Sequence, residues 1–426
     1  MSHAQPRKRP EGLAAYMAVT AAYWAFMLSD GALRMLVLLH FHGQGFTPVQ
    51  LAYLFLLYEL AGIITNLTAG WLAARLGLAF TLYAGLGLQV LALLALAQLS
   101  PDWGLWASVA YVMAVQGAAG VAKDLAKTSA KSAVKSLAPA AEGGLFRWVA
   151  VLTGSKNAVK GLGFFLGAAL LAWAGFGPAV LGMAMVLAVI LLAIAVLMPA
   201  GLPQGKSSAK FREVLSRDPN LNWLAVARLF LFGARDVWFV VGIPVYFYAV
   251  LSDGTAQGNS RAFYLIGGFM AVWTILYGAV QAAAPRLLGA AKAPRAVLVG
   301  RARSLVGGLV VVPALLAAAV WWAGAPTTWL TGVVAVGLLA FGAIFALNSA
   351  LHSYLVLAFA QAERVSMDVG FYYMANAAGR LLGTLMSGLC YQLGGVAACL
   401  AMAALFLLAS WGAAARLQAR AAPTAG

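Results

Sequence analysis

Charged side chains are scarce in this sequence: they make up 9% of its 426 residues, whereas hydrophobic residues make up 63%. A water-soluble globular protein carries about a quarter charged residues. Because no soluble fold can hide this much apolar surface, the solvent around most of the chain must be lipid. Nearly uncharged stretches of roughly 20 residues, the length of a helix that crosses a bilayer, recur along the chain. The sequence therefore predicts an all-α polytopic membrane protein.

Cysteine and histidine are also scarce. Cys390 and Cys399 form no CxxC pair and have no neighbouring His, so we interpret them as small packing residues between helices. The histidines form no metal-ligand pattern, and no nucleophile–base pair stands out. We expect no metal, no cofactor and no enzymatic activity. No ten-residue alternation of apolar and polar residues repeats, which argues against a lipid-facing barrel.

Twelve transmembrane helices can be placed along the chain, with a polar segment in the middle. This layout predicts a six-helix bundle at 1–200, a cytoplasmic loop at 201–222 and a second six-helix bundle at 223–426. The expected spans are 14–40, 49–72, 78–99, 104–123, 148–173, 178–199, 223–250, 263–284, 304–323, 329–358, 369–392 and 395–414. The tenth apolar run is longer than one upright helix needs.

The basic residues predict the orientation. Of 28 Lys and Arg residues, 21 fall on the side of the N-terminus, Arg261 alone falls on the other side, and six fall within spans. Cytoplasmic loops of membrane proteins carry such an excess, so both termini are expected in the cytoplasm. The net charge of +16 is thus explained by topology and by anionic lipid headgroups, without a nucleic-acid partner.

The two halves share an order of polar residues. Two matched pairs of segments show it: Phe26–Asp30 with Phe232–Asp236, and Asn157–Lys160 with Asn376–Arg380. A six-plus-six parallel repeat around a polar central loop is the layout of major facilitator transporters. We therefore expect the major facilitator fold of two six-helix bundles.

Nine ionisable residues fall clearly within the predicted spans, where each costs about 2.5–3.5 kcal/mol to insert. The predicted substrate-binding residues are the basic ones, together with two asparagines: Arg34, Lys156, Lys160, Arg228, Arg235, Arg380, Asn157 and Asn376. The residues predicted to couple charge or protons are the acids: Asp30, Glu59 and Asp236. An excess of positive charge in a low-dielectric cavity favours an anionic solute, and Arg suits the bidentate capture of oxyanions.

Several of these residues have a second interpretation. Asp30 and Arg34 share a helix face and could form a structural or gating ion pair. Asp236 could do no more than neutralise its neighbour Arg235. Arg228 lies nearer the cytoplasmic end of its span and could extend to the interface. Glu59, isolated in its span, could carry a proton in antiport or pack as a neutral acid.

Two groups of lysines are spaced at one helical turn. Lys156 and Lys160 repel each other unless an anion sits between them or a carboxylate screens them. The segment Lys123–Lys135 repeats Lys at every fourth residue, which gives a basic stripe on a helix. The stripe either lies along the inner membrane surface or forms a vestibule that attracts anions.

The segment Gly70-Trp71-Leu72-Ala73-Ala74-Arg75-Leu76-Gly77 resembles the loop motif between spans two and three of the major facilitator superfamily. The resemblance implies a gating role for Gly70, Arg75 and Gly77. Ala74 stands where that motif usually has an acid, and the basic pair usual after Gly77 is missing.

Three longer stretches, Ser29–His42, Gly120–Leu125 and Leu152–Gly161, resemble the ArsJ family of organoarsenical efflux permeases. The resemblance implies export of 1-arseno-3-phosphoglycerate across a bacterial inner membrane, and hence arsenate resistance. It also implies a partner, the glyceraldehyde-3-phosphate dehydrogenase that makes this ester from arsenate. The two oxyanions of the ester agree with the interior excess of basic residues.

Three alternatives stay open. A transporter of the same superfamily could carry another organic phosphate or organic anion. A drug pump fits less well, because cationic drugs usually need unpaired acids in the membrane. A membrane-embedded enzyme or lipid-binding receptor has no support from a nucleophile, a base or a metal cluster.

Overall fold

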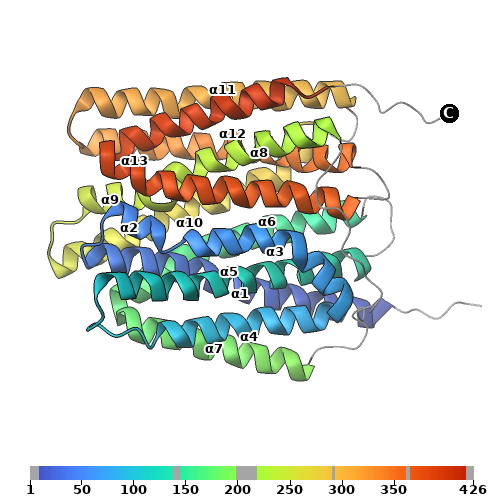
Figure 1. The fold of residues 1–426 in the computed structure, drawn as a ribbon, viewed down its shortest axis with the longest axis horizontal. Helices are drawn as coiled ribbons and strands as arrows, with labels where there is room; N and C mark the ends of the chain where they lie inside the picture. Colours follow the sequence, from blue (N-terminus) through green and yellow to red (C-terminus); the bar gives the residue numbers. More distant parts are fainter. Residues whose placement is uncertain (1–8, 138–143, 198–217, 290–292, 361–364, 419–426) are drawn as a thin grey trace, which may run out of the picture.

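The apolar stretches fold into long helices that run side by side (Figure 1). The structure, a computed structural model, describes residues 9–137, 144–197, 218–289, 293–360 and 365–418, and these residues contain no strand. Within them, ten helical segments are long and apolar enough to cross a membrane. The helices of the first half are α1 (Arg9–Gly43), α2 (Pro48–Tyr53), α3 (Leu56–Leu76), α4 (Leu78–Leu96), α5 (Leu105–Leu137), α6 (Gly144–Ala174) and α7 (Phe176–Leu197).

The second half is similarly built from long helices, two of which are interrupted. Its elements are α8 (Pro219–Val237), η1 (Trp238–Gly242), α9 (Ile243–Leu251), α10 (Ala256–Leu287), α11 (Arg295–Ala323), α12 (Thr328–Phe359) and α13 (Val365–Ala415). The π-helical turn η1 joins α8 and α9 into one rod. Gly395, with φ of 62°, breaks α13 into two rods at a conformation that favours glycine. Counted with these two interruptions, the described residues form the twelve rods that the sequence predicts.

Local sequence sets several of the helix ends. The Thr47 hydroxyl accepts from the Gln50 amide while the Gln50 side chain accepts from the Thr47 amide, and Pro48 occupies the first turn of α2. The Asp218 carboxylate caps α8 by accepting from the amide of Asn220 at 2.7 Å. Gly77, with φ of 91°, separates α3 from α4.

Several predicted spans differ in their bounds from the observed helices. The fourth, predicted to end at 123, continues in α5 as far as Leu137. The seventh begins at Pro219, inside the segment predicted as the central loop, most of which lies outside the described residues. The tenth, predicted at 329–358, matches the continuous helix α12 to within one residue at each end. Periodicity did not mark the end of α5 because the basic stripe keeps the helical spacing of the apolar run before it.

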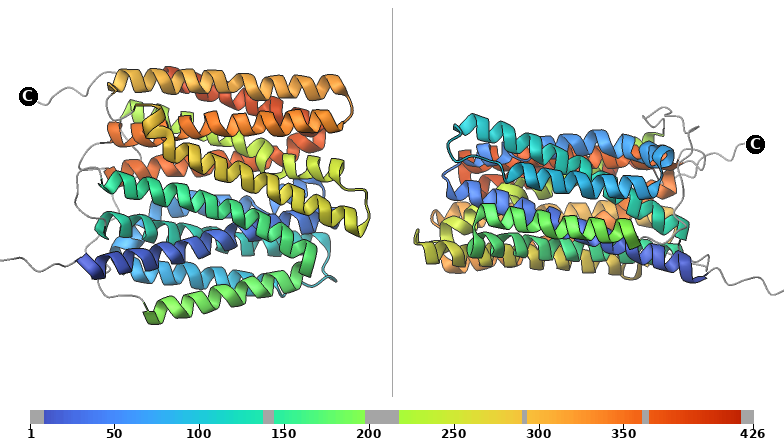
Figure 2. Two further views of the ribbon diagram at one scale, coloured as in Figure 1. Left: turned by 180° about the vertical axis from the view of Figure 1, so that it is seen from behind. Right: turned by 90° about the horizontal axis from the view of Figure 1, so that it is seen from below.

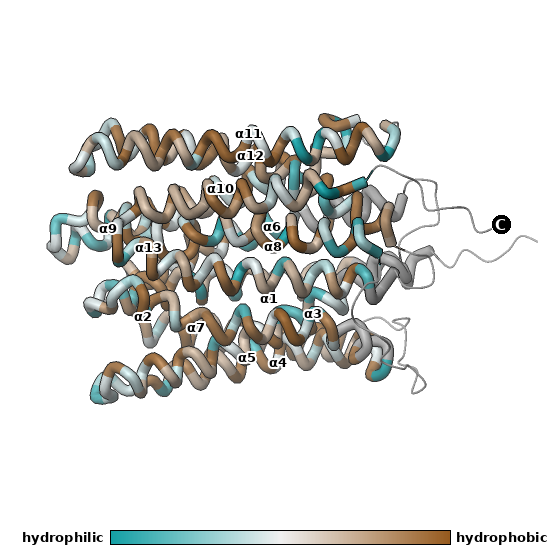
Figure 3. The backbone as a smooth tube through the Cα atoms, turned by 45° about the horizontal axis from the view of Figure 1, so that its top comes forward, coloured by the Kyte–Doolittle hydropathy of each residue, from teal (hydrophilic) through white to brown (hydrophobic). Residues whose placement is uncertain are grey.

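The two halves lie next to each other, with α7 and α11 at opposite edges of the bundle (Figures 1 and 2). α1 begins and α13 ends at the same end of the bundle. Hydrophobic residues predominate along the rods and hydrophilic ones gather mainly towards their ends (Figure 3). Between the halves, α6 packs along α10 and α3 packs along α13.

Glycines allow equivalent close contacts within each half. A Cβ at Gly163 of α6 would overlap the Leu28 carbonyl oxygen of α1. A Cβ at Gly383 of α13 would overlap the Gly233 carbonyl oxygen of α8. Small residues let membrane helices approach at backbone distance. The predicted internal repeat therefore appears again in the packing, where it brings the polar residues of paired helices close together.

Candidate functional site

A chain of ion pairs crosses the contact between the two halves. Oε1 of Glu59 on α3 accepts from Arg34 of α1 at 3.1 Å and from Arg380 of α13 at 2.6 Å. Arg380 also reaches Asp236 of α8, with 3.4 Å between Nε and Oδ2. Asp236 Oδ1 lies 2.5 Å from Nη2 of its neighbour Arg235. Through Glu59, a single carboxylate links the first half to the second.

A second ion pair adjoins this chain. Lys160 of α6 donates to Asp30 of α1, and the Tyr58 hydroxyl donates to the other oxygen of Asp30 at 2.6 Å. Tyr58 immediately precedes Glu59, so the two groups of charges meet on α3. The Nζ atom of Lys123 lies 4.0 Å from the centre of the Tyr58 ring, within reach of a cation–π interaction.

The two halves repeat one ionic contact. In the first half the acid of α1, Asp30, pairs with the base of α6, Lys160. In the second half the acid of α8, Asp236, pairs with the base of α13, Arg380. These four residues hold corresponding places in the repeat seen in the sequence. The symmetry is incomplete, because only Arg380 also contacts the opposite half, through Glu59.

The acids and bases of this cluster differ in burial. The side chains of Asp30, Glu59 and Asp236 are at most 2% exposed, whereas those of Arg34, Lys160, Arg235 and Arg380 are 13–18% exposed. The carboxylates are thus more deeply buried than the cationic groups. A partly exposed cation can attract an anion, whereas a fully buried carboxylate that is paired with its own base repels it less strongly.

Aromatic rings cover the flanks of the guanidinium groups. Arg34 lies 5.1 Å from the centre of the Phe55 ring, and Arg235 lies 4.9 Å from that of Phe232. Such rings exclude water and stabilise a cation at the same time. With water excluded, the remaining edges of the guanidiniums bind an oxyanion more strongly than they would at an exposed surface.

Arg228 forms a separate group on α8. Its Nε donates to Oδ1 of Asn376 on α13 at 3.0 Å, and its Nη1 donates to the carbonyl and hydroxyl oxygens of Ser349 on α12 at 3.1 and 3.0 Å. Its guanidinium carbon lies 3.9 Å from the centre of the Phe232 ring. The interpretation that Arg228 extends to the membrane interface is therefore wrong: its side chain is held inside the second half.

One other sequence interpretation is also wrong. The possible ion pair between Asp30 and Arg34 does not form, because each has a closer partner on another helix, Lys160 and Glu59 respectively. Glu59, isolated within its own span, likewise has its partners on other helices, since two arginines donate to it. Spacing along one helix did not predict these contacts, because the partners come from neighbouring helices.

Of the remaining predicted residues, those on α6 lie near the cluster and the three predicted to gate lie far from it. Nδ2 of Asn157 on α6 donates to Gln281 of α10 at 3.0 Å, across the contact between the halves. Lys156 lies one turn from Lys160 on the same helix and is half-buried. The residues predicted to gate, Gly70, Arg75 and Gly77, lie at the far end of α3, roughly 16–27 Å along the helix from Glu59.

Sequence reasoning missed a group on α5. Lys123, predicted at the cytoplasmic surface, is buried, because α5 continues beyond it. Lys127 Nζ lies 2.5 Å from Oδ1 of Asp124 and donates to Asn66 of α3 at 2.7 Å. These two lysines of the basic stripe thus face other helices, while the side chains of Lys131 and Lys135 lie outside the described residues. The signal was Asp124, the single acid within the stripe.

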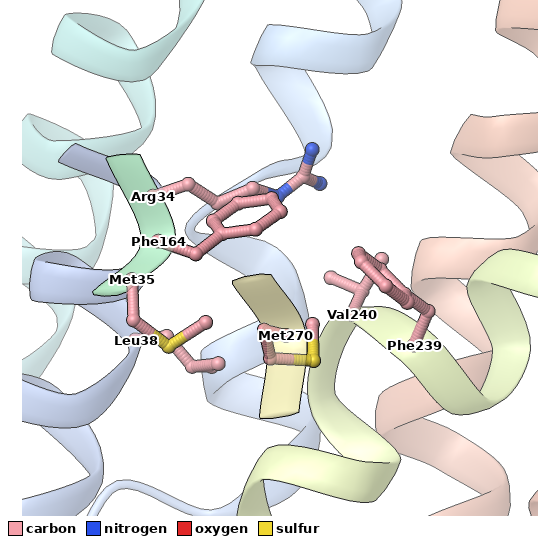
Figure 4. Close-up of a pocket in the computed structure, with 7 residues that line it drawn as sticks. All are labelled: Arg34, Met35, Leu38, Phe164, Phe239, Val240 and Met270. Carbon is pink, nitrogen blue, oxygen red and sulfur yellow. The ribbon is translucent and has the colours of Figure 1, made fainter. Parts of the chain in front are cut away.

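A small cavity lies beside the cluster and between the halves (Figure 4). Arg34, Met35, Leu38 and Phe164 line it from the first half, and Phe239, Val240 and Met270 line it from the second. Its volume of about 10 Å³ leaves room for about one water molecule. A larger solute therefore does not fit this cavity in the structure described.

No group of three or more His, Cys, Asp or Glu side chains in the described part of the chain could hold a metal ion. A scan against protein families finds no match for the sequence, and a search of curated proteins finds none. Two solved structures are similar over nearly the whole chain. A mutant of the nucleoside transporter NupG is 15% identical, covers 95% of this chain and 98% of its own, and has a TM-score of 0.66.

The second structure is a POT family transporter in complex with a thioalcohol-conjugated peptide, at 13% identity and a TM-score of 0.68. The match covers 94% of this chain and 95% of that one. With the twelve rods described above, these likenesses show that the protein has the major facilitator fold, as the sequence predicts. Neither structure is described as a member of the ArsJ family, so that resemblance rests on the sequence stretches alone.

Proposed function

We propose that the protein is a major facilitator transporter that exports a small organic anion, namely the phosphorylated organoarsenical 1-arseno-3-phosphoglycerate. The observation that carries the proposal is the charge cluster between the halves. Four basic side chains, those of Arg34, Lys160, Arg235 and Arg380, face three acids there, Asp30, Glu59 and Asp236. The excess of basic residues between the two repeats supports the proposal, because major facilitator transporters bind their solutes between the repeats, near the middle of the membrane.

An anion can act on this cluster by competition. A phosphate or arsenate group offers the same acceptor oxygens as Glu59, so it can bind Arg34 and Arg380 in its place. A carboxylate released from both arginines in a low-dielectric site takes up a proton rather than stay charged. Solute binding at the cluster would thus be accompanied by protonation of Glu59, so that solute and proton bind together; this couples their movement in the same direction and differs from the proton antiport considered from the sequence.

The same exchange would loosen the contact between the halves. Glu59 is the carboxylate through which Arg34 of one half is linked to Arg380 of the other. When an anion holds both arginines, this direct link through Glu59 is broken and only the solute connects them, and when the anion leaves, Glu59 rejoins the halves. This order of events ties the movement of the halves to the presence of the solute.

The arsenical is proposed on the resemblance to the ArsJ family, supported by the positive cluster. In this proposal the partner is a glyceraldehyde-3-phosphate dehydrogenase that makes the ester, and the location is a bacterial inner membrane with both chain ends in the cytoplasm. The test is to express the protein with such a dehydrogenase in an arsenate-sensitive bacterium. We expect growth on arsenate and less arsenic in the cells, and neither protein alone should protect.

Matched variants make this test specific. Arg380→Gln should abolish protection at an unchanged membrane level of the protein, because the anion loses its ligand from the second half. Arg261→Gln removes the same charge from an exposed position on α10 and should protect like the wild type. Failure of the wild-type pair to protect would rule out the arsenical as the solute.

A second candidate is transport of another organic phosphate or organic anion. Guanidinium and ammonium groups bind phosphate, arsenate and carboxylate alike, so the cluster itself does not single out arsenic. Uptake of labelled phosphate esters into inverted vesicles separates the two: uptake without arsenate protection supports this candidate. A cationic drug is not favoured, because Asp30, Glu59 and Asp236 are all paired with bases.

A further inference from the structure

Arg228 is a buried cation without an acid. Its side chain is 4% exposed, and no carboxylate of the described residues lies within salt-bridge distance of it. Its hydrogen-bond partners, Asn376 and Ser349, are neutral. Every other basic residue described at this depth on α8 or α13 has a carboxylate partner. A buried charge is costly unless it is paired, so this one calls for an anion from outside the chain.

Polar side chains without partners stand beside Arg228. Asn348 and His352 of α12 are fully buried, and neither has a hydrogen-bond partner for its amide or ring nitrogens. They flank Ser349, which holds Arg228, and His352 lies on the same helix face one turn from Ser349. Buried donors of this kind normally have hydrogen-bond partners, so the lack of partners for Asn348 and His352 also indicates that an acceptor from outside the chain binds here.

The position of this group relative to the ion-pair chain is set by helix geometry. Arg228 precedes Arg235 by seven residues on α8, a rise of roughly 10 Å, and the two residues share one face. Its partner Asn376 precedes Arg380 by four residues on α13, a rise of roughly 6 Å. The group thus lies beyond the ion-pair chain, towards the end of the bundle where α8 and α13 begin.

We propose that Arg228, Asn348 and His352 form a second oxyanion subsite, so that the solute binds with an anionic group at each end. One end would bind at Arg34 and Arg380, and the other at Arg228. The rises of roughly 6 and 10 Å along α13 and α8 are of the order that a three-carbon chain with an oxyanion at both ends spans. The inference rests on the proposed function and narrows its substrate class, because a solute with one anionic end would leave Arg228 unpaired.

Binding to the full-length protein in detergent tests the subsite. The probes are 3-phosphoglycerate, which is anionic at both ends, and glycerol 3-phosphate, which is anionic at one end. We expect the wild type to bind the first about tenfold more tightly, the difference that one charge-assisted contact makes. Arg228→Gln should remove this preference while changing the affinity for glycerol 3-phosphate less than about twofold.

Two further variants exclude a merely structural effect. Arg228→Lys keeps the charge without the forked geometry and should retain part of the preference. Arg261→Gln should retain all of it. Thermal unfolding of each variant shows whether it is folded, and the ratio of the two affinities does not depend on the fraction of active protein.

Three results would overturn the subsite: a wild type without preference, equal weakening of both probes by Arg228→Gln, or an unchanged preference in that variant. These results differ from failure of the proposed function. If the arsenate-resistance assay fails while the two-ended preference is present and depends on Arg228, the subsite stands and only the arsenical is wrong.

Discussion

At the scale of residues, the buried ion pairs between the helices cost free energy to form. Buried ions lose their hydration, and a buried ion pair often stabilises a fold less than apolar residues of the same shape would. Glu59 has two arginine partners on one oxygen, while its other oxygen, Oε2, is buried without a partner. This is a poor arrangement for stability alone. It suits a carboxylate that an incoming anion has to displace.

Removing the charge of Glu59 should therefore destabilise the protein, because two partly buried arginines lose their acid. Glu59→Gln leaves Arg34 and Arg380 facing each other without their shared acid. Because both arginines are partly exposed, water offsets some of the penalty, and we expect the free energy of unfolding to fall by about 2 kcal/mol. Thermal unfolding in detergent measures it. The double variant Glu59→Gln, Arg380→Gln should recover part of the loss, and a strictly additive loss would contradict the pairing.

At the scale of elements, close helix contacts position the charges. Asp30 meets Lys160 because α6 approaches α1 at backbone distance, and Asp236 meets Arg380 because α13 approaches α8 in the same way. Gly379 lies beside Arg380, and a Cβ at Gly379 would overlap the Leu229 carbonyl oxygen of α8. The helix contact and the ion pair are thus neighbours in both sequence and space.

Gly379→Ala should separate α13 from α8 and lengthen the contact between Arg380 and Asp236. Overpacking of this kind costs about 1–3 kcal/mol, and we expect a lower unfolding temperature together with weaker solute binding. Gly412→Ala is the matched control, because a Cβ at Gly412 of the same helix meets nothing within 4 Å. The control should be as stable as the wild type or slightly more so. Equal unfolding temperatures and equal solute binding in the two variants would show that this close contact affects neither property.

At the scale of the whole molecule, the two halves are closed on each other at the site. The cavity between them holds about 10 Å³, and Gly62 of α3 lies against Ala377 of α13, one turn from Glu59 and Arg380 respectively. A solute that crosses the membrane between the halves must open this contact. The alternating movement of two repeats around a central site is the general mechanism of this fold.

A disulfide between the halves should therefore stop transport. A Cβ at Gly62 would lie 3.7 Å from the Cβ of Ala377, a separation that suits a disulfide. In a chain with Cys390 and Cys399 replaced by Ala, the pair Gly62→Cys, Ala377→Cys should crosslink on oxidation and lose efflux, and a reducing agent should restore it. Each single variant should be insensitive to oxidation. Transport by the crosslinked protein would show that the halves need not separate here.

The sequence alone determined the fold class and most of the charged residues that lie between the helices. Both depend on local properties: the length of apolar runs, the side on which Lys and Arg collect, and the match between the two halves. The same local reasoning identified Arg34, Glu59, Asp236 and Arg380 as interior residues. It did not identify Lys123, because a lysine at the end of an apolar run has the same pattern whether the helix stops or continues.

Only the tertiary structure decided which charges meet. Glu59 and Arg380 are 321 residues apart in the chain, and Lys160 is 130 residues from Asp30. Spacing along one helix predicts contacts only within about a turn, and it wrongly favoured Asp30 with Arg34. Which helices are neighbours depends on how the two halves pack, and this packing links Arg34 and Arg380 through Glu59 while it leaves Arg228 without an acid.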